Sequence, residues 1–178
     1  MKTWILLLRG INVGGNNLIK MQDLRALLAK AGFQNVRSYI QSGNIALESE
    51  ISEATQIRQQ VQDCIEASHG FTPKTLALDA DTLAQIIADN PFPEAVDPPK
   101  NLHVFFLAHA PDTPNIEALS ALCTASERYV ITDHAAYLHL PDGSGNSKLS
   151  AQLEKHIGVP ATARNWRSVN KILELAAK

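Results

Sequence analysis

The sequence predicts an α+β protein built from two tandem ferredoxin-like halves, each with the element order β-α-β-β-α-β, followed by a C-terminal helix. Three observations support this prediction. The first 78 residues show strand and helix patterns in that order, the order repeats after residue 100, and a proline-rich stretch separates the two. The expected organisation is a first half at 1–78, a connecting helix and linker at 79–100, and a second half with the C-terminal helix at 101–178.

The first half begins with the continuous apolar run Trp4–Leu8, which is typical of a strand covered by other elements. Helical spacing of apolar residues, stop signals at Gly32 and Gly70, and the tight turn Ser42-Gly43 define the rest of this half. Its remaining elements are expected as a helix at 21–31, strands at 36–40 and 45–47, a helix at 54–68 and a strand at 72–78.

The second half repeats this order after a connecting helix at 81–88 and the proline-rich linker Asn90–Lys100. A turn at Asp133-His134 separates its middle strands. Its elements are expected as a strand at 102–107, a helix at 116–124, strands at 128–132 and 136–140, a helix at 148–157, a short strand at 160–163 and an amphipathic helix carrying Val169, Ile172, Leu173 and Ala176. The repeat is one of secondary structure rather than of obvious sequence.

Composition indicates a globular chain without membrane partners. Of its 178 residues, 45% are hydrophobic and 19% charged, and the longest apolar runs are about five residues, too short to span a bilayer. No signal-peptide cleavage pattern follows the N-terminal apolar run, so we expect a cytoplasmic protein. Cys64 and Cys123 fit helical patterns and are expected as free thiols.

Charge is unevenly distributed although the net charge is only −2. Residues 1–47 carry +5, residues 48–127 carry −10 and residues 128–178 carry +3. This distribution has two interpretations: a solvated acidic face in the middle of the chain, or a cationic surface to which both ends contribute.

The loop RGINVGGNN, Arg9–Asn17, leaves the first strand with three glycines and three asparagines. Gly10 and Gly15 have the G-x-x-x-x-G spacing of a phosphate loop, but Asn16-Asn17 stands where Lys-Ser/Thr is required. Free amides could still hold an anion beside an arginine. Alternatively, the glycines supply positive φ angles and the asparagines cap turns. The candidate ligand residues of this loop are Arg9, Asn12, Gly14 and Gly15.

The predicted topology pairs this loop with the turn between the second and third strands. Ser42 and Asn44 of that turn join the candidate ligand residues, although no histidine or acid can be tied to Ser42 to make it a nucleophile. A turn-end amide contributes little to a core, so we expect Asn44→Ala to affect ligand binding with little loss of stability.

The same topology pairs the loop Pro141–Lys148 with Arg164-Asn165-Trp166 at the exit of the last strand. Lys148 lies in the first turn of a helix, where a cation gains nothing from the helix dipole but could meet an anion. Trp166 either packs in the core or stacks on a base. We expect Arg9, Lys148 and Arg164 to converge on one cleft between the halves, or Arg164 to pair with an acid as a structural brace.

Catalytic and metal chemistry find little support in the sequence. The six histidines show no H-x-x-x-H spacing and the cysteines no C-x-x-C, so no metal site is expected. No general base or nucleophile can be assigned, which leaves catalysis and any cofactor open.

Four segments of this sequence also occur together, in the same order, in one bacterial protein family. They are RGINVGG (Arg9–Gly15), SGN (Ser42–Asn44), SKL (Ser147–Leu149) and TARNW (Thr162–Trp166). On these segments the sequence resembles the domain-of-unknown-function family 1697 over nearly its whole length. Asn16 and Ala163 depart from the family pattern, where a basic residue and a threonine are common. The resemblance implies two ferredoxin-like halves and no established activity.

The leading hypothesis is a protein that binds an anionic small ligand, phosphorylated or nucleotide-like, between the two halves. The alternatives are a nucleic-acid-binding module and a protein-interaction domain without catalysis. Few aromatic residues on the strands and a negative net charge weigh against nucleic acid. The oligomeric state is open.

Overall fold

The computed structural model describes all 178 residues, and they form two compact units. Unit 1 comprises Met1–Gln85 together with Lys171–Lys178, and unit 2 comprises Ile86–Asn170. The boundaries between the units therefore fall within two helices, α3 (Ala80–Ala88) and α6 (Trp166–Ala176). The sequence-based division assigns all of the C-terminal helix to the second half, whereas the structure groups its last turns with the first.

Unit 1 has the ferredoxin-like order of elements that the sequence predicts. Its elements before α3 are β1 (Lys2–Arg9), α1 (Met21–Lys30), β2 (Gln34–Tyr39), β3 (Asn44–Ser49), α2 (Ala54–His69) and β4 (Lys74–Asp79). The strands form one antiparallel sheet in the order β2-β3-β1-β4. The stop predicted at Gly70 is confirmed, because this residue caps α2 with a φ of 75° and donates its N–H to the Glu66 carbonyl.

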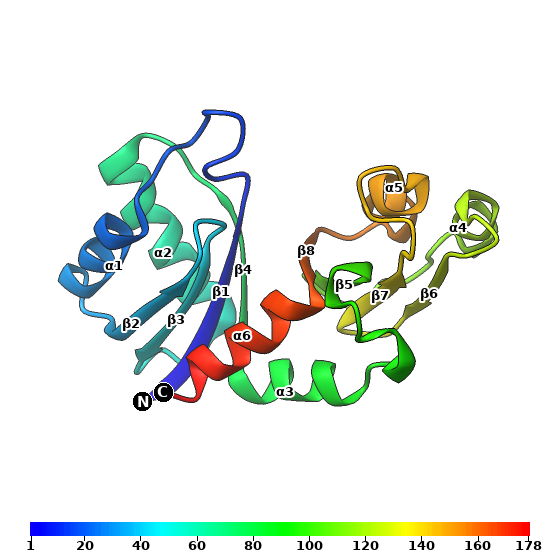
Figure 1. Ribbon diagram of the computed structural model, residues 1–178. Coiled ribbons are helices and arrows are strands. Elements are labelled where there is room, and N and C mark those ends of the chain that lie inside the picture. The colour runs from blue at the N-terminus through cyan, green and yellow to red at the C-terminus, as the bar shows by residue number, and fades with distance from the viewer. The chain divides into compact units, whose positions relative to one another are not determined.

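Helices α1 and α2 lie on one face of this sheet (Figure 1). Alternate residues of β1 point toward them, since successive side chains of a strand face opposite sides. The core that results combines strand and helix residues, among them Trp4, Leu6, Leu8, Leu24, Leu28, Ile57, Val61 and Ile65. This packing explains why the apolar spacing of both helices can be read from the sequence.

Unit 2 repeats the arrangement. Beyond α3 it contains the 3-10 turns η1 (Pro93–Ala95) and η2 (Pro99–Asn101), then β5 (Leu102–Leu107), α4 (Ile116–Leu122), β6 (Arg128–Ile131), β7 (Ala135–His139), α5 (Lys148–Ile157) and β8 (Ala161–Asn165). Its sheet has the order β6-β7-β5-β8, equivalent to that of unit 1. The tandem repeat is confirmed, and β8 is longer than expected because it includes Arg164 and Asn165.

The core of unit 2 also lies between its sheet and two helices. Phe105 and Leu107 of β5 pack with Leu119 of α4 and with Leu149 and Leu153 of α5. The side chain of Ser147 caps α5 by accepting a hydrogen bond from the Ser150 N–H at 3.1 Å.

The centre of the sheet face opposite the helices is also buried in each unit. In unit 1, Ile5 and Leu7 are inaccessible to solvent, and Arg37 Nη1 of β2 donates to the Leu175 carbonyl of α6 at 2.6 Å. In unit 2, Phe106 and Tyr137 are buried, and the Tyr137 hydroxyl donates to the Ile86 carbonyl of α3 at 2.6 Å. The centre of this face is therefore covered in both sheets, whereas Val130 at the β6 edge of unit 2 is exposed.

None of the helices combines the length and the hydropathy that a membrane span requires. Cys64 and Cys123 are both free, as the sequence predicts. Burial raises the pKa of each thiol, which keeps both in the less reactive protonated form.

Candidate functional site

The loop after β1 contacts the turn between β2 and β3, which confirms the pairing that the topology predicts. The Leu8 N–H donates to the Gly43 carbonyl at 2.8 Å. Farther along the loop, Asn12 Nδ2 donates to the carbonyls of Ile19 and Gln41, both at 2.9 Å, and Asn12 Oδ1 accepts from the Ile19 N–H. The Asn12 amide thus links the start of the loop to its end at Ile19 and to the neighbouring turn at Gln41.

Gly14 and Gly15 occupy the tip of the loop. Their φ angles of 58° and 78° are both in the left-handed region, and the Asn16 N–H donates to the Val13 carbonyl at 3.0 Å. Two adjacent residues with positive φ are what a tight two-residue hairpin turn of the primed type requires. The glycines and asparagines of this loop therefore serve its geometry, which supports the turn-forming interpretation of the sequence.

Asn44 and Ser42 form the other side of this contact. Asn44 is inaccessible to solvent, and its Nδ2 donates to the Tyr39 carbonyl at 3.2 Å and to Ser42 Oγ at 3.0 Å. The expectation that Asn44 is a turn-end amide outside the core is wrong, because the residue lies within β3 and pairs with Leu7 of the central strand. Its burial makes it part of the structural support of the turn.

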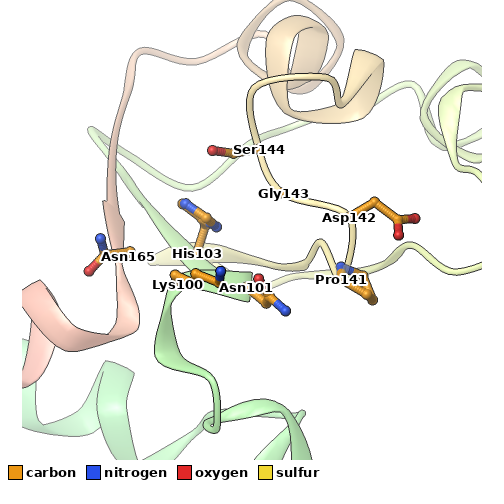
Figure 2. Close-up of a pocket in the computed structure, with 8 residues that line it drawn as sticks. All are labelled: Lys100, Asn101, His103, Pro141, Asp142, Gly143, Ser144 and Asn165. Atoms are coloured by element: carbon orange, nitrogen blue, oxygen red, sulfur yellow. The ribbon is translucent and has the colours of Figure 1, made fainter.

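A polar pocket of about 460 Å³ lies at the other predicted pairing, between the loop after β7 and the end of β8 in unit 2 (Figure 2). We call it the unit 2 pocket, and its lining residues are Lys100, Asn101, His103, Pro141, Asp142, Gly143, Ser144 and Asn165. The sequence-based pairing of the loop Pro141–Lys148 with Asn165 is confirmed by this shared lining. Lys100, Asn101 and His103, from η2 and the start of β5, were not anticipated as site residues.

His103 stands in the middle of the pocket (Figure 2). It lies two residues before Phe105 on β5 and so shares the helix-facing side of the strand. Burial lowers the pKa of His103, so the imidazole is neutral at neutral pH. Its Nδ1 is buried and makes no hydrogen bond.

The unpartnered nitrogen indicates the tautomer of this histidine. A proton on Nδ1 would be a buried donor without an acceptor, which is rarer and more costly than an unpaired acceptor. We therefore assign the proton of the neutral ring to Nε2. His103 then offers an N–H donor to a ligand in the pocket.

Asn165 and Asp142 each have one side-chain oxygen engaged outside the pocket. Asn165 Oδ1 accepts from the Ser168 N–H at 2.9 Å and so caps α6. Asp142 Oδ2 accepts from Ser126 Oγ at 2.8 Å, and its carboxylate points away from His103 (Figure 2). The donors available to a ligand include Lys100, the N–H of His103 and the amide nitrogen of Asn165.

Most of the chain matches the model of one protein family. That family is described as "Protein of unknown function (DUF1697)", and the match covers residues 1–137. The chain belongs to this family. The matched region includes all of unit 1 up to Gln85 and the pocket residues Lys100, Asn101 and His103, but it ends before the loop that begins at Pro141.

The fold of this DUF1697 protein is also found in a solved structure, that of the conserved bacterial protein SP0830 from Streptococcus pneumoniae. The two chains align over 98% of each with a TM-score of 0.68, at 24% sequence identity. At this level of identity the likeness concerns the fold alone. No curated protein matches the chain.

The remaining candidate residues of the DUF1697 chain do not all join the unit 2 pocket. Arg164 pairs with Val104 in the sheet, whereas Asn165 pairs with His103, so these neighbours face opposite sides. Burial lowers the pKa of Arg164 to about 10, and its Nη1 donates to the Ala163 carbonyl at 2.8 Å. Lys148 is exposed at the start of α5, in the helix layer on the other side of the sheet.

Unit 2 therefore does not bring Lys148 and Arg164 together, because α5 covers one face of the sheet and Arg164 belongs to the other. Trp166 is half-buried as the first residue of α6, and its carbonyl accepts from Asn170 Nδ2 at 2.8 Å. The expected convergence of Arg9, Lys148 and Arg164 on one cleft is therefore wrong, because two of the three lie on opposite sides of the same sheet.

Proposed function

We propose that this DUF1697 protein binds a small anionic ligand, phosphorylated or nucleotide-like, in the unit 2 pocket. The observation that carries the proposal is the position of His103, whose neutral ring lines an open polar pocket together with Lys100, Asn101 and Asn165. A volume of about 460 Å³ is within the range of pockets that hold small molecules.

Charge and hydrogen-bonding capacity support an anion. Lys100 supplies an ammonium group, the imidazole of His103 supplies an N–H, and the amide of Asn165 keeps its nitrogen while its oxygen caps α6. Hydrogen bonds from such donors to a charged acceptor are about twice as strong as bonds between neutral groups. Asp142 is the acidic residue in the lining, and its carboxylate is turned toward Ser126.

The structure offers less support for nucleic acid as the ligand. Ferredoxin-like domains that bind RNA do so by stacking bases on aromatic residues of an open sheet face. Here the central residues of the corresponding faces are buried, and the Tyr137 hydroxyl is bonded to the Ile86 carbonyl. We also propose that the protein acts in the cytoplasm, where two unpaired cysteines such as Cys64 and Cys123 are kept reduced.

Isothermal titration calorimetry with inorganic phosphate, pyrophosphate and adenosine monophosphate tests the proposal. We expect at least one of these probes to bind, and Lys100→Ala to weaken its affinity by about 10–100-fold, the effect of losing one charge-assisted hydrogen bond. Lys148→Ala is the matched control, since Lys148 is an exposed lysine of the same unit outside the pocket lining. Absence of binding by all three probes, or equal losses in the two variants, would contradict the proposal.

A further inference from the structure

Four side chains from three segments of unit 2 meet at the edge of its sheet. Phe92 and Glu94 belong to the proline-rich linker between α3 and β5, Arg128 is the first residue of the edge strand β6, and His139 is the last residue of β7. Arg128 and His139 lie directly opposite each other in this antiparallel pair of strands. We call these four residues the clasp.

Arg128 contacts each of the other three members of the clasp. Its Nη2 donates to Glu94 Oε1 and lies 3.0 Å from His139 Nδ1, and its guanidinium carbon lies 4.6 Å from the centre of the Phe92 ring. The linker is thus attached to β6 by an ion pair and by a cation–π contact. Phe92 is buried although Arg128 is exposed, so the guanidinium forms part of the cover of this ring.

The contact between Arg128 and His139 determines the protonation state of the imidazole. A guanidinium group has only donors, so Nδ1 of His139 accepts and the proton of the neutral ring is on Nε2. A second proton, on Nδ1, would replace this acceptor by a donor and place two cations side by side. The hydrogen bond therefore exists only while the imidazole is neutral.

The surroundings of His139 disfavour its protonation. Burial lowers the pKa of His139 and the charge of Arg128 lowers it further, whereas the carboxylate of Glu94 acts in the opposite direction. Its cross-strand neighbour on β5 is the uncharged Leu102. Arg128 on β6 and Glu94 in the linker are thus the charged groups that face this histidine, and they oppose each other.

We propose that the clasp is a pH-sensitive device, which holds the linker on the β6 edge while His139 is neutral and releases it when His139 takes up a proton. On protonation, the guanidinium of Arg128 loses an acceptor and is repelled by the imidazolium. It then withdraws from the Phe92 ring, which loses part of its cover. The competing arrangement is an imidazolium that pairs with Glu94 and keeps the linker in place.

The segments that the clasp joins continue into the lining of the unit 2 pocket. Lys100 is the last residue of the linker, and β7 leads from His139 into the loop that begins at Pro141. Release of the clasp therefore frees one end of the segment that supplies the ammonium group of the pocket. The inference goes beyond the proposed anionic ligand, because the clasp can be tested with no ligand present.

Proton NMR of the full-length protein tests the titration of the clasp. The pKa of His139, followed by its imidazole Cε1–H resonance, should lie below the ordinary value of about 6.5, and Arg128→Gln should raise it by removing the neighbouring cation. The resonance of His109, an exposed histidine outside the clasp, is the matched control and should titrate alike in both proteins. A pKa of His139 at or above the ordinary value, or one that Arg128→Gln leaves unchanged, would overturn the proposal and favour the pairing with Glu94.

Amide hydrogen exchange tests the release of the linker. The Ala95 N–H donates to the Phe92 carbonyl within η1, so its protection factor reports whether this turn is held. Between about pH 7.5 and pH 5 we expect this factor to fall by about threefold or more, the scale on which a partly exposed charge pair changes an equilibrium. His139→Gln keeps a neutral acceptor for Arg128 and should remove the fall. His103 is present in both proteins, so an equal fall in the two would assign the effect to unit 2 as a whole and overturn the proposal, as would a constant factor in the unaltered protein.

Discussion

Replacement of Gly43 by alanine should destabilise unit 1 far more than alanine at any other glycine of its loops. Gly43 adopts a φ of 79°, and a Cβ atom built on it would lie 2.6 Å from Leu8 Cβ and 3.0 Å from Ile11 Cδ1. The Leu8 contact is with the stem of a side chain on the central strand, which cannot move without shifting the strand. The bond from the Leu8 N–H to the Gly43 carbonyl holds the two segments at this distance.

Gly15 provides a matched control for the size of this effect. It has nearly the same φ, 78°, but a Cβ there would meet nothing within 4 Å. Gly15→Ala therefore carries only the cost of a left-handed alanine, about 1 kcal/mol after the loss of unfolded-state entropy. Gly43→Ala adds the cost of forcing an extra methyl group into a packed site, typically about 1–3 kcal/mol, for a total of roughly 2–4 kcal/mol.

The assay is thermal and urea unfolding followed by the fluorescence of Trp4, which is buried in unit 1. Both variants are made in a Trp166→Phe background, because Trp166 belongs to unit 2 and would mix its signal with that of Trp4. At about 2–4 °C per kcal/mol, we expect a fall in melting temperature of roughly 2–4 °C for Gly15→Ala and roughly 5–15 °C for Gly43→Ala. Equal losses in the two variants would refute the close approach of the turn to β1.

Two further outcomes are expected from buried polar groups. Because burial lowers the pKa of His103, the unfolded chain takes up a proton before the folded one as the pH falls. The melting temperature relative to His103→Asn should therefore be constant above about pH 6.5 and decrease below it, and an increase on acidification would contradict the burial of the ring. Asn44→Ala should cost about 1–3 kcal/mol in urea unfolding, since it removes the donor to the Tyr39 carbonyl, and a loss below about 0.5 kcal/mol would show that the turn holds without it.

Much of the fold could be predicted from the sequence because its signals are local and agree with one another. The apolar run Trp4–Leu8 forms the centre of β1, and the element order alone places the first loop beside the turn at Gly43. The strand β8 is longer than its sequence pattern indicates. Its five residues contain two alanines and three polar residues, and its pairing with β5 supplies the stability that strand propensity does not.

The candidate site was harder to predict from the sequence, because it depends on strand register and on burial by residues that are distant in the sequence. Arg164 and Asn165 are adjacent, yet pairing with β5 sends them to opposite faces, and this parity cannot be known before the register is. Asn44 is polar but buried, because its amide finds partners within its own turn. His103 carried a weak signal: it is the polar residue in the otherwise apolar strand LHVFFL, on the side that faces the helices.

The return of the last turns of α6 to unit 1 has a consequence for how the protein is made. A ribosome completes residues 1–85 early, but the segment that places the Leu175 carbonyl on Arg37 of β2 is translated only after the whole of unit 2. At about 5–20 residues per second, the intervening unit takes roughly 4–17 s to synthesise. Throughout that interval the nascent first unit lacks its closing segment, and the Arg37 side chain on its sheet lacks the carbonyl partner that it has in the finished protein.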